Sequence, residues 1–199
     1  YYRDRGYLKF SIESSQISLS RDKKSIFITY NVNEGDKYTI DNVDVMGEIP
    51  FDEEVYIDIV NSLKDQIYSQ AQITSIEEFF INVLGNRGYA FAEVSGDTEI
   101  INDSNKVNLT FTVVPGSKTY TRKIIFTGNN VTQDYVLRRE MRQFEGAWTS
   151  DNSIEAGKVR LERLGYFKEV NVETIPVPGT EDQIDIAVSY THLTLPTMS

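Results

Sequence analysis

The sequence contains no cysteine and only one histidine, His192. Without cysteine the chain has no disulfide bond, no thiolate zinc site and no cysteine nucleophile. Histidine is the side chain most often used for acid–base catalysis and metal binding, and here it occurs only close to the C-terminal end. The lack of cysteine does not decide the compartment, because disulfide-free proteins occur in both the cytosol and the periplasm.

Long apolar runs and blocks of basic residues are missing as well. No stretch approaches the roughly 18 apolar residues with which a helix crosses a bilayer. The net charge is −10 and the isoelectric point is about 4.7. Nucleic acids and anionic membrane surfaces both attract lysine and arginine, so this acidic chain is a poor match for either partner. The chain opens at Tyr1 as if inside an element, which leaves a preceding secretory signal open.

Catalytic motifs are absent from the sequence. It has no G-x-S-x-G, no H-E-x-x-H and no phosphate-cradling loop. The acidic groups at 52–54 and 77–78 lie at predicted helix starts, where they favour the helix dipole. Gly85–Gly88 has the G-x-x-G spacing of a KH nucleotide clamp, but here it precedes a strand instead of joining two helices. We therefore predict no enzyme activity, no cofactor and no metal site.

The chain does contain an internal repeat of about 80 residues. Arg5-Gly6-Tyr7 recurs as Arg87-Gly88-Tyr89 and again as Leu164-Gly165-Tyr166. A second landmark, a glycine twelve residues after another glycine, occurs at Gly35 and Gly47 and again at Gly116 and Gly128. Two independent landmarks with nearly equal spacing indicate tandem copies of one unit.

Each unit is predicted to run β-α-α-β-β. Residues 40–46 and 120–127 alternate with period two, as half-buried first strands do. The last strand of each unit has the clearest alternation, and its inward positions are Ile26, Ile28, Tyr30 and Val32, then Val107, Leu109, Phe111 and Val113, then Ile184, Ile186 and Val188. Polar turns precede these strands, which is typical of hairpins. The pattern predicts an α+β fold with a three-stranded mixed sheet under two helices.

The helices between the strands show a period near 3.6. Residues 52–64 are expected to form the first helix of the middle unit. Its second helix has one apolar face, made by Ile73, Ile76, Phe80 and Leu84. Thr74–Glu77 fits a capping box, and Gly88 ends the helix. The last unit repeats the face with Ile154, Gly157, Leu161 and Leu164, and its glycine is expected to let the helix lie close to the sheet.

These units predict the domain organisation. Residues 1–36 form the second half of one unit, 37–116 a complete unit and 117–188 another. The linkers are very short, so neighbouring units should contact each other. Residues 189–199 match no part of the repeat and resemble translated cloning sequence, so they are expected to be a non-native tail.

The β-α-α-β-β unit with Gly-Tyr opening its second strand resembles a POTRA module. Three segments resemble the BamA family of outer-membrane protein assembly factors, within the Omp85 group: Tyr2–Tyr7, Asn33–Asp36 and, above all, Val136–Trp148. The last segment is typical of the membrane-proximal module of that family. The resemblance implies that the chain holds the end of the third module, the fourth and the fifth.

The resemblance also implies a function. Such modules lie in the periplasm of Gram-negative bacteria, bind accessory lipoproteins, and guide unfolded outer-membrane β-barrel proteins toward the protein's own C-terminal membrane barrel, which is absent from this chain. An extended client could add to an open sheet edge, where main-chain pairing is largely independent of sequence. The second strands, at about 8–14, 89–98 and 166–175, are the candidate edges. The alternative is a related secretion or translocation pore with one dedicated client.

Candidate partner-binding residues lie in the last unit. Leu137, Met141 and Phe144 are expected to form the core face of its first helix, which leaves three arginines off that face. By the resemblance, a lipoprotein partner would contact Arg138, Arg139, Arg142 and Glu145, with Trp148 as a further contact. Two other interpretations stay open. The arginines could be a solvated face paired with acidic neighbours, and Trp148 could pack inside the module or at a junction.

Overall fold

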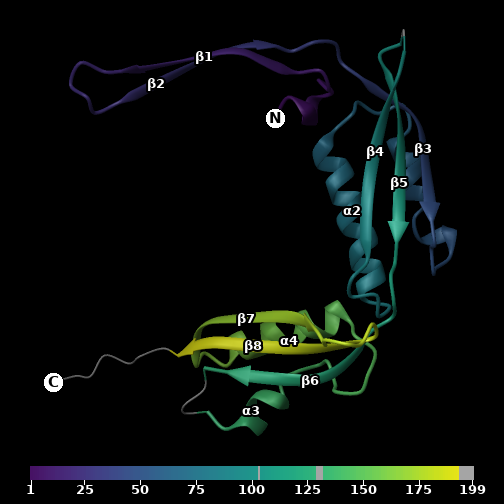
Figure 1. Cartoon of the computed structure of the whole chain (residues 1–199), viewed down its shortest axis with the longest axis vertical. Helices are drawn as coiled ribbons and strands as arrows, with labels where there is room; N and C mark the ends of the chain where they lie inside the picture. The colour runs from purple at the N-terminus through teal and green to yellow at the C-terminus, as the bar shows by residue number, and fades with distance from the viewer. Residues whose placement is uncertain (103, 129–131, 193–199) are drawn as a thin grey trace. The chain divides into compact units, whose positions relative to one another are not determined.

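The computed structural model describes residues 1–102, 104–128 and 132–192. The chain forms two compact units, one of residues 1–79 with 94–113 and the other of residues 80–93 with the chain from 114 onward. The element order is a hairpin followed twice by β-α-α-β-β (Figure 1). The predicted α+β fold with tandem repeats is therefore confirmed.

The first repeat contributes a short 3-10 turn, η1 (Arg3–Arg5), and a hairpin of β1 (Ser11–Leu19) and β2 (Ile26–Asn33). Among the described residues no helix or third strand packs on this hairpin. Ile26, Ile28 and Tyr30 are 64%, 52% and 55% exposed, whereas their counterparts in the middle repeat are fully buried. The apolar alternation in β2 therefore predicts which face of the strand is apolar. That face becomes buried only where helices and a third strand of the same repeat are present.

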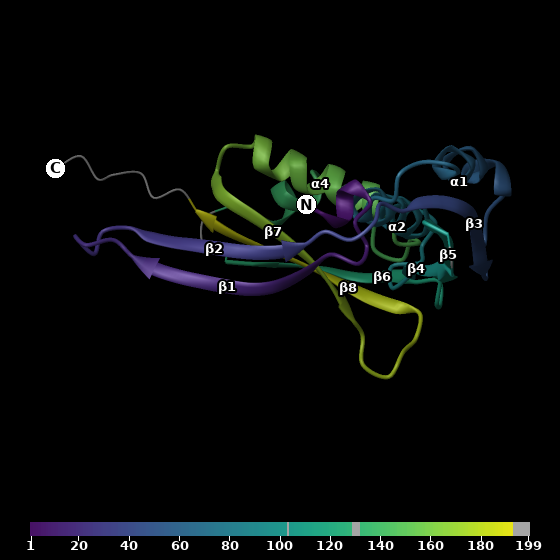
Figure 2. The ribbon, with the colours of Figure 1, turned by 90° about the horizontal axis from the view of Figure 1, so that it is seen from above.

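The middle repeat consists of β3 (Thr39–Gly47), η2 (Glu53–Val55), α1 (Ile57–Leu63), α2 (Gln70–Gly85), β4 (Glu93–Ile101) and β5 (Lys106–Val114). Its sheet has the order β3-β5-β4, with β3 parallel to β5. Both α-helices lie on one side of β4 and β5 (Figure 2). The predicted inward positions are buried: Val107, Leu109, Phe111 and Val113 on β5, and Ile73, Ile76, Phe80 and Leu84 on α2.

The last repeat consists of β6 (Tyr120–Thr127), α3 (Asp134–Arg138), α4 (Asp151–Arg163), β7 (Phe167–Pro176) and β8 (Gln183–His192). The sheet order is β6-β8-β7, with β6 parallel and β7 antiparallel to β8. Helix α4 packs on β7, on one side of the sheet (Figure 2). The core beneath the helices joins Ile124, Leu137, Met141, Leu161, Phe167, Val170, Ile184, Ile186, Val188 and Tyr190.

Strand β8 runs past residue 188, where the last repeat was expected to end. Val170 pairs with Tyr190 and Glu169 with Thr191, and Tyr190 is buried in the core. Residues 189–192 thus belong to the sheet and not to a separate tail. The origin of the tail stays a prediction, and residues 193–199 lie outside the described part of the chain.

Two expected helix features are wrong. Helix α2 begins at Gln70, so the proposed capping box at Thr74–Glu77 lies inside it. Ser69 Oγ instead accepts from the Gln72 N–H at 3.4 Å, and the Glu77 carboxylate accepts from the N–H of Gly96 at 2.7 Å. Similarly, Gly157 of α4 makes its close approach to Met141 and not to the sheet.

Candidate partner-binding site

The first helix of the last repeat is short, and an irregular segment follows it. Helix α3 ends at Arg138, and residues 139–150 lead to α4 without regular structure. Leu137 and Met141 are buried as predicted, but Phe144 is 68% exposed. The expectation that Phe144 belongs to the core face is therefore wrong, because the helix ends before its side chain could turn inward. We call residues 139–148 the display loop.

Arg138 is bound inside the module. Its guanidinium forms ion pairs with Asp134 at 2.5 Å and Glu145 at 2.9 Å, and it donates to the carbonyl of Ile124 at 3.0 Å. It also lies 5.4 Å from the ring centre of Phe126. The two carboxylates, Asp134 first, raise the pKa of Arg138. Most of its donors therefore already have partners within the module.

Glu145 completes this cluster. Its carboxylate accepts from the N–H of Ile124 at 2.8 Å and from Arg138. The backbone N–H and then the guanidinium lower the pKa of Glu145. Arg138 and Glu145 thus hold the display loop against strand β6, and a role of either residue in binding a partner stays a prediction.

Arg139 and Arg142 differ in their surroundings. Arg139 Nε donates to Glu140 at 3.1 Å, and the same carboxylate accepts two bonds from Arg160 at 3.0 and 2.7 Å. Arg160 is the chief reason why the pKa of Glu140 is lowered. Arg142 is exposed and makes no ion pair within the described part of the chain. Of the three arginines, Arg142 has the charge most available to a partner.

Gln143 fixes the shape of the display loop. It is only 3% exposed. Its Nε2 donates to the carbonyl of Trp148 at 2.9 Å and to that of Phe144 at 3.3 Å, and its Oε1 accepts from the N–H of Ser150 at 3.0 Å. A buried amide with three bonds to its own loop defines where Arg142 and Phe144 point. Sequence reasoning missed this residue, because nothing in its spacing distinguishes it from an exposed glutamine.

Trp148 packs within the second unit while staying 44% exposed. Its ring stacks on Tyr120 with centroids 3.8 Å apart, and the Lys118 ammonium lies 4.4 Å from the ring centre. Its backbone bridges to Tyr120 at the outer edge of the sheet. These contacts support the interpretation of Trp148 as a packing residue, and a contact with a partner stays a prediction.

The sheet topology places the expected client strands. β4 and β7 lie at outer edges of the two complete sheets, and β1 pairs only with β2 in the described chain. These strands are the second strands of their repeats, at somewhat later residues than predicted. An edge strand presents unpaired N–H and C=O groups to an extended segment. Client binding at these edges stays a prediction.

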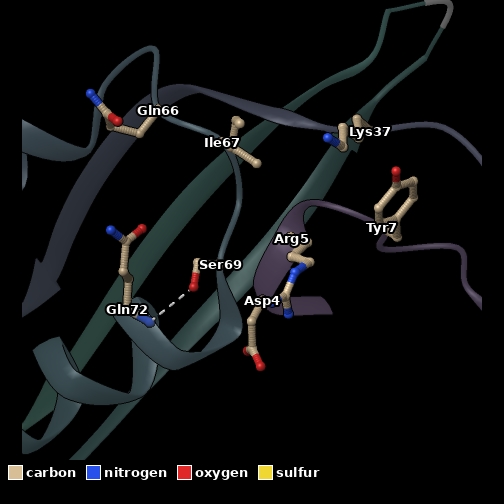
Figure 3. Close-up of a pocket in the computed structure, with 8 residues that line it drawn as sticks. All are labelled: Asp4, Arg5, Tyr7, Lys37, Gln66, Ile67, Ser69 and Gln72. Carbon is tan, nitrogen blue, oxygen red and sulfur yellow. Dashed lines mark hydrogen bonds between the residues drawn. The ribbon is translucent and has the colours of Figure 1, made fainter. Parts of the chain in front are cut away.

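A pocket of about 500 Å³ lies in the first unit, lined by Asp4, Arg5, Tyr7, Lys37, Gln66, Ile67, Ser69 and Gln72 (Figure 3). Beside it, Asp4 Oδ1 accepts from the N–H of Ala71 at 3.0 Å, at the start of α2, and Tyr38 N–H donates to the carbonyl of Gly6 at 2.9 Å. The pocket is lined by one carboxylate and no histidine, so it offers no set of metal ligands. Because its lining residues come from the first and the middle repeats, it marks a junction between repeats.

The second unit repeats these junction bonds. Thr119 N–H donates to the carbonyl of Gly88 at 2.7 Å. Asn86 Oδ1 accepts from the N–H of Asn152 at 2.8 Å, at the start of α4. Asp4 and Asn86 both lie two residues before the repeat glycine and bind the second helix of the next repeat. This position was visible in the repeat, but only the structure shows what it binds.

Asp151, the first residue of α4, has a partly buried carboxylate. Gly85 approaches this carboxylate so closely that a methyl group there would collide with it. Burial raises the pKa of Asp151. Because the pKa of this carboxyl is raised in the folded state, its ionisation opposes folding. The loss of stability begins as the pH rises through the ordinary carboxyl pKa of the unfolded chain, and it is complete above the raised pKa of the folded state.

We therefore expect Asp151→Asn to stabilise the second unit at about pH 7 and to leave its stability unchanged near pH 3, where the carboxyl is protonated in both states. Urea denaturation, monitored by the fluorescence of Trp148, the one tryptophan, measures the free energy of unfolding at both pH values. Glu155→Gln, which removes an exposed carboxylate one turn further along α4, is the matched control variant. A destabilised Asp151→Asn at neutral pH would contradict the assignment.

Among the helices that the structure describes, none combines the length and the hydrophobicity of a membrane-spanning segment. Over the same residues, no group of three or more acidic or histidine side chains could hold a metal ion.

Three stretches of the chain match one family model, described as POTRA, surface antigen variable number repeat: residues 1–35, 38–116 and 119–191. Together with the β-α-α-β-β sheets, these matches define the chain as a tandem array of small periplasmic-type modules. The chain belongs to the POTRA family.

Among characterised relatives, it is 31% identical to outer membrane protein assembly factor BamA of Neisseria meningitidis over 193 residues, which is 96% of this chain and 24% of that protein. The BamA of Buchnera aphidicola is 31% identical over 186 residues, 94% of this chain and 30% of the relative. The chain thus spans about a quarter to a third of the length of these relatives.

Solved structures agree with this relationship. A crystal structure of Haemophilus influenzae BamA POTRA 3–5 superposes with a TM-score of 0.87 at 29% identity, covering 96% of this chain and 76% of that one. A crystal structure of Haemophilus ducreyi BamA lacking POTRA domains 1–3 superposes with a TM-score of 0.69 at 35% identity. The match covers 78% of this chain and 30% of that one. Within the POTRA family the chain is therefore homologous to BamA, as the end of the third module, the fourth and the fifth. It is a periplasmic portion of a Gram-negative outer-membrane protein.

Proposed function

We propose that these modules are a non-catalytic periplasmic scaffold that binds accessory lipoproteins of an outer-membrane assembly machine and passes unfolded barrel proteins to a membrane barrel. The observation that carries the lipoprotein part is the display loop. It presents a 68% exposed phenylalanine, Phe144, two residues from the exposed Arg142, which makes no ion pair with the described residues. An exposed aromatic ring beside an arginine is the composition of an interface hot spot.

The loop is suited to this role because it is already ordered. Gln143 holds it from within, and the Arg138–Glu145 pair fastens it to β6. A preordered loop loses little conformational entropy on binding, so more of the contact energy appears as affinity. Arg139 lies beside the loop and Glu145 at its end, and we propose that they form the rim of the same surface.

The open sheet edges support the client part of the proposal. Main-chain pairing at β4 or β7 would accept many unfolded barrel segments with little dependence on sequence. Such binding needs no catalytic group.

Measured affinity for purified accessory lipoproteins tests the proposed docking loop. We expect Arg142→Glu and Phe144→Ala each to weaken binding at least about tenfold, since truncated hot-spot residues cost about 2 kcal/mol or more. Both side chains are exposed, so circular dichroism and Trp148 fluorescence should be unchanged. Biolayer interferometry with the lipoproteins purified without their lipid anchors gives the dissociation constants.

Two substitutions in the same repeat serve as matched controls. Arg163→Glu reverses another exposed arginine, and Tyr166→Ala removes another half-exposed aromatic ring. Both should bind like the parent chain. Equal weakening by all four substitutions would point to bulk charge and hydrophobicity. Binding that none of them affects would move the lipoprotein site away from the display loop. If no lipoprotein binds even the parent chain, a pore with one dedicated client becomes the better explanation.

A further inference from the structure

Both complete sheets have their first strand, β3 or β6, at the edge opposite β4 or β7. An edge strand can accept an added strand only where its outward N–H and C=O groups are unpaired. The two edges begin alike. In β3 the N–H of Ile40 donates to Gln66 at 2.9 Å, and its carbonyl accepts from Asp65 at 2.9 Å. The backbone of residues 146–147 makes the same two bonds to Thr121, at 2.7 and 3.0 Å.

Three residues further on, the β6 edge is closed by side chains. The N–H of Ile124 donates to Glu145 at 2.8 Å, and its carbonyl accepts from Arg138 at 3.0 Å. The 2.9 Å ion pair between Arg138 and Glu145 joins the two ends of this closure. A carboxylate and a guanidinium thus occupy the two positions that an added strand would use. We call this pair the edge plug.

The β3 edge has no such plug. Val43 lies 81 residues before Ile124, the same spacing as from Ile40 to Thr121, and each strand has a register irregularity just before it. At that spacing the plug residues correspond to Ile57 and Lys64. The isoleucine side chain has no group that could donate to a carbonyl, and the lysine ammonium cannot accept from an N–H. Within the described ranges, no bond outside the sheet reaches the backbone of β3 from residue 43 onward.

We infer that the edge of β3 at Val43–Met46 is an open docking edge for an extended basic segment of an unfolded polypeptide, and that β6 is closed to such a segment. This rests on the proposed scaffold function and assigns client pairing to the edge opposite β4 in the middle repeat. The exposed carboxylates of Asp44 and Glu48 flank the open edge, so a strand with alternating lysines complements its charge. The neighbouring valines, Val43 and Val45, are only partly covered and can pack on the apolar positions of such a strand.

Amide hydrogen exchange, measured by NMR on the whole chain, tests this inference. The probe is a synthetic peptide of about ten residues in which valine and lysine alternate. We expect the peptide to slow exchange at Val43 and Val45 at least about tenfold and to leave Ile124 unaffected. The double substitution Ile57→Arg/Lys64→Glu transfers the plug to the middle repeat and should abolish the added protection.

A second variant does not depend on the transferred plug forming. Asp44→Lys reverses an exposed charge on the open edge and should weaken the binding of the peptide there. The peptide concentration needed to slow exchange at Val43 and Val45 should rise at least about tenfold. Ile125→Lys places the same charge at the matching position of the closed edge and should leave the protection of Val43 and Val45 by the peptide unchanged. Protection only at β4 or β7 would overturn the β3 assignment and leave edge pairing in place. No protection anywhere would overturn both the assignment and the client part of the proposed function.

Discussion

Gly47→Ala is expected to destabilise the middle repeat by about 3 kcal/mol or more, which is a large part of the stability of a small module. Gly47 ends β3 with φ at +108°, in the region that residues with a side chain avoid. A Cβ there would also collide with the backbone carbonyl of Val113 on β5. The strain and the collision act together, because β3 cannot move away without losing its pairing. Chemical denaturation followed by circular dichroism measures the loss.

Gly179→Ala separates the two causes. Gly179 has φ at +81°, but among the described residues other than its two chain neighbours no atom lies within 4 Å of the position that a Cβ would take. Backbone strain alone should therefore cost about 1–2 kcal/mol. If Gly47→Ala and Gly179→Ala cost the same, the collision with Val113 contributes nothing.

Gly47 also shows why the repeat could be read from the sequence. Its counterpart Gly128 has φ at +84°, and a Cβ there would lie 2.7 Å from the carbonyl of Tyr190. Gly47 is the last residue of β3 and Gly128 directly follows β6, and each lies against the last strand of its repeat. A position that tolerates no side chain is the same in every copy of a fold, so it is visible in one sequence. The alternating strands and the α2 face were predictable for the same reason, because burial imposes their period.

The display loop was not predictable in this way. Its expected helix face was right at Leu137 and Met141 and wrong at Phe144. In the middle repeat the position 81 residues before Phe144 is Leu63, which ends a longer helix and is buried. The periodicity is alike in both repeats, and the length of the helix decides which way the side chain points. That length depends on tertiary bonds from Gln143, Arg138 and Glu145, which no local pattern shows.

The capping box at Thr74–Glu77 failed for a related reason. The motif S/T-x-x-E is short, and it also occurs inside helices. Here Glu77 binds the N–H of Gly96 on β4, a residue 19 positions away in the chain. A contact of that kind needs the folded sheet. The junction residues Asp4 and Asn86 were likewise present in the repeat, but their partners lie in the next copy.

Gln143→Met is expected to cost about 2–4 kcal/mol of stability in the last repeat and to weaken lipoprotein binding as well. Methionine matches the volume of glutamine but cannot bond to Trp148, Phe144 or Ser150. The buried N–H and C=O groups would then lack their partner, which costs more than the bonds contribute. Denaturation followed by Trp148 fluorescence measures the stability, and biolayer interferometry measures the binding.

Arg142→Met is the matched control, because it places the same side chain one residue away at an exposed position. It should weaken binding and leave stability within about 0.5 kcal/mol of the parent chain. Gln143→Met should affect both, because the loop that presents Phe144 is ordered by the buried amide. If Gln143→Met lowers stability and binding stays intact, the loop is held by the edge plug alone. The shape of the proposed interface would then come from Arg138 and Glu145, the residues that also close the β6 edge.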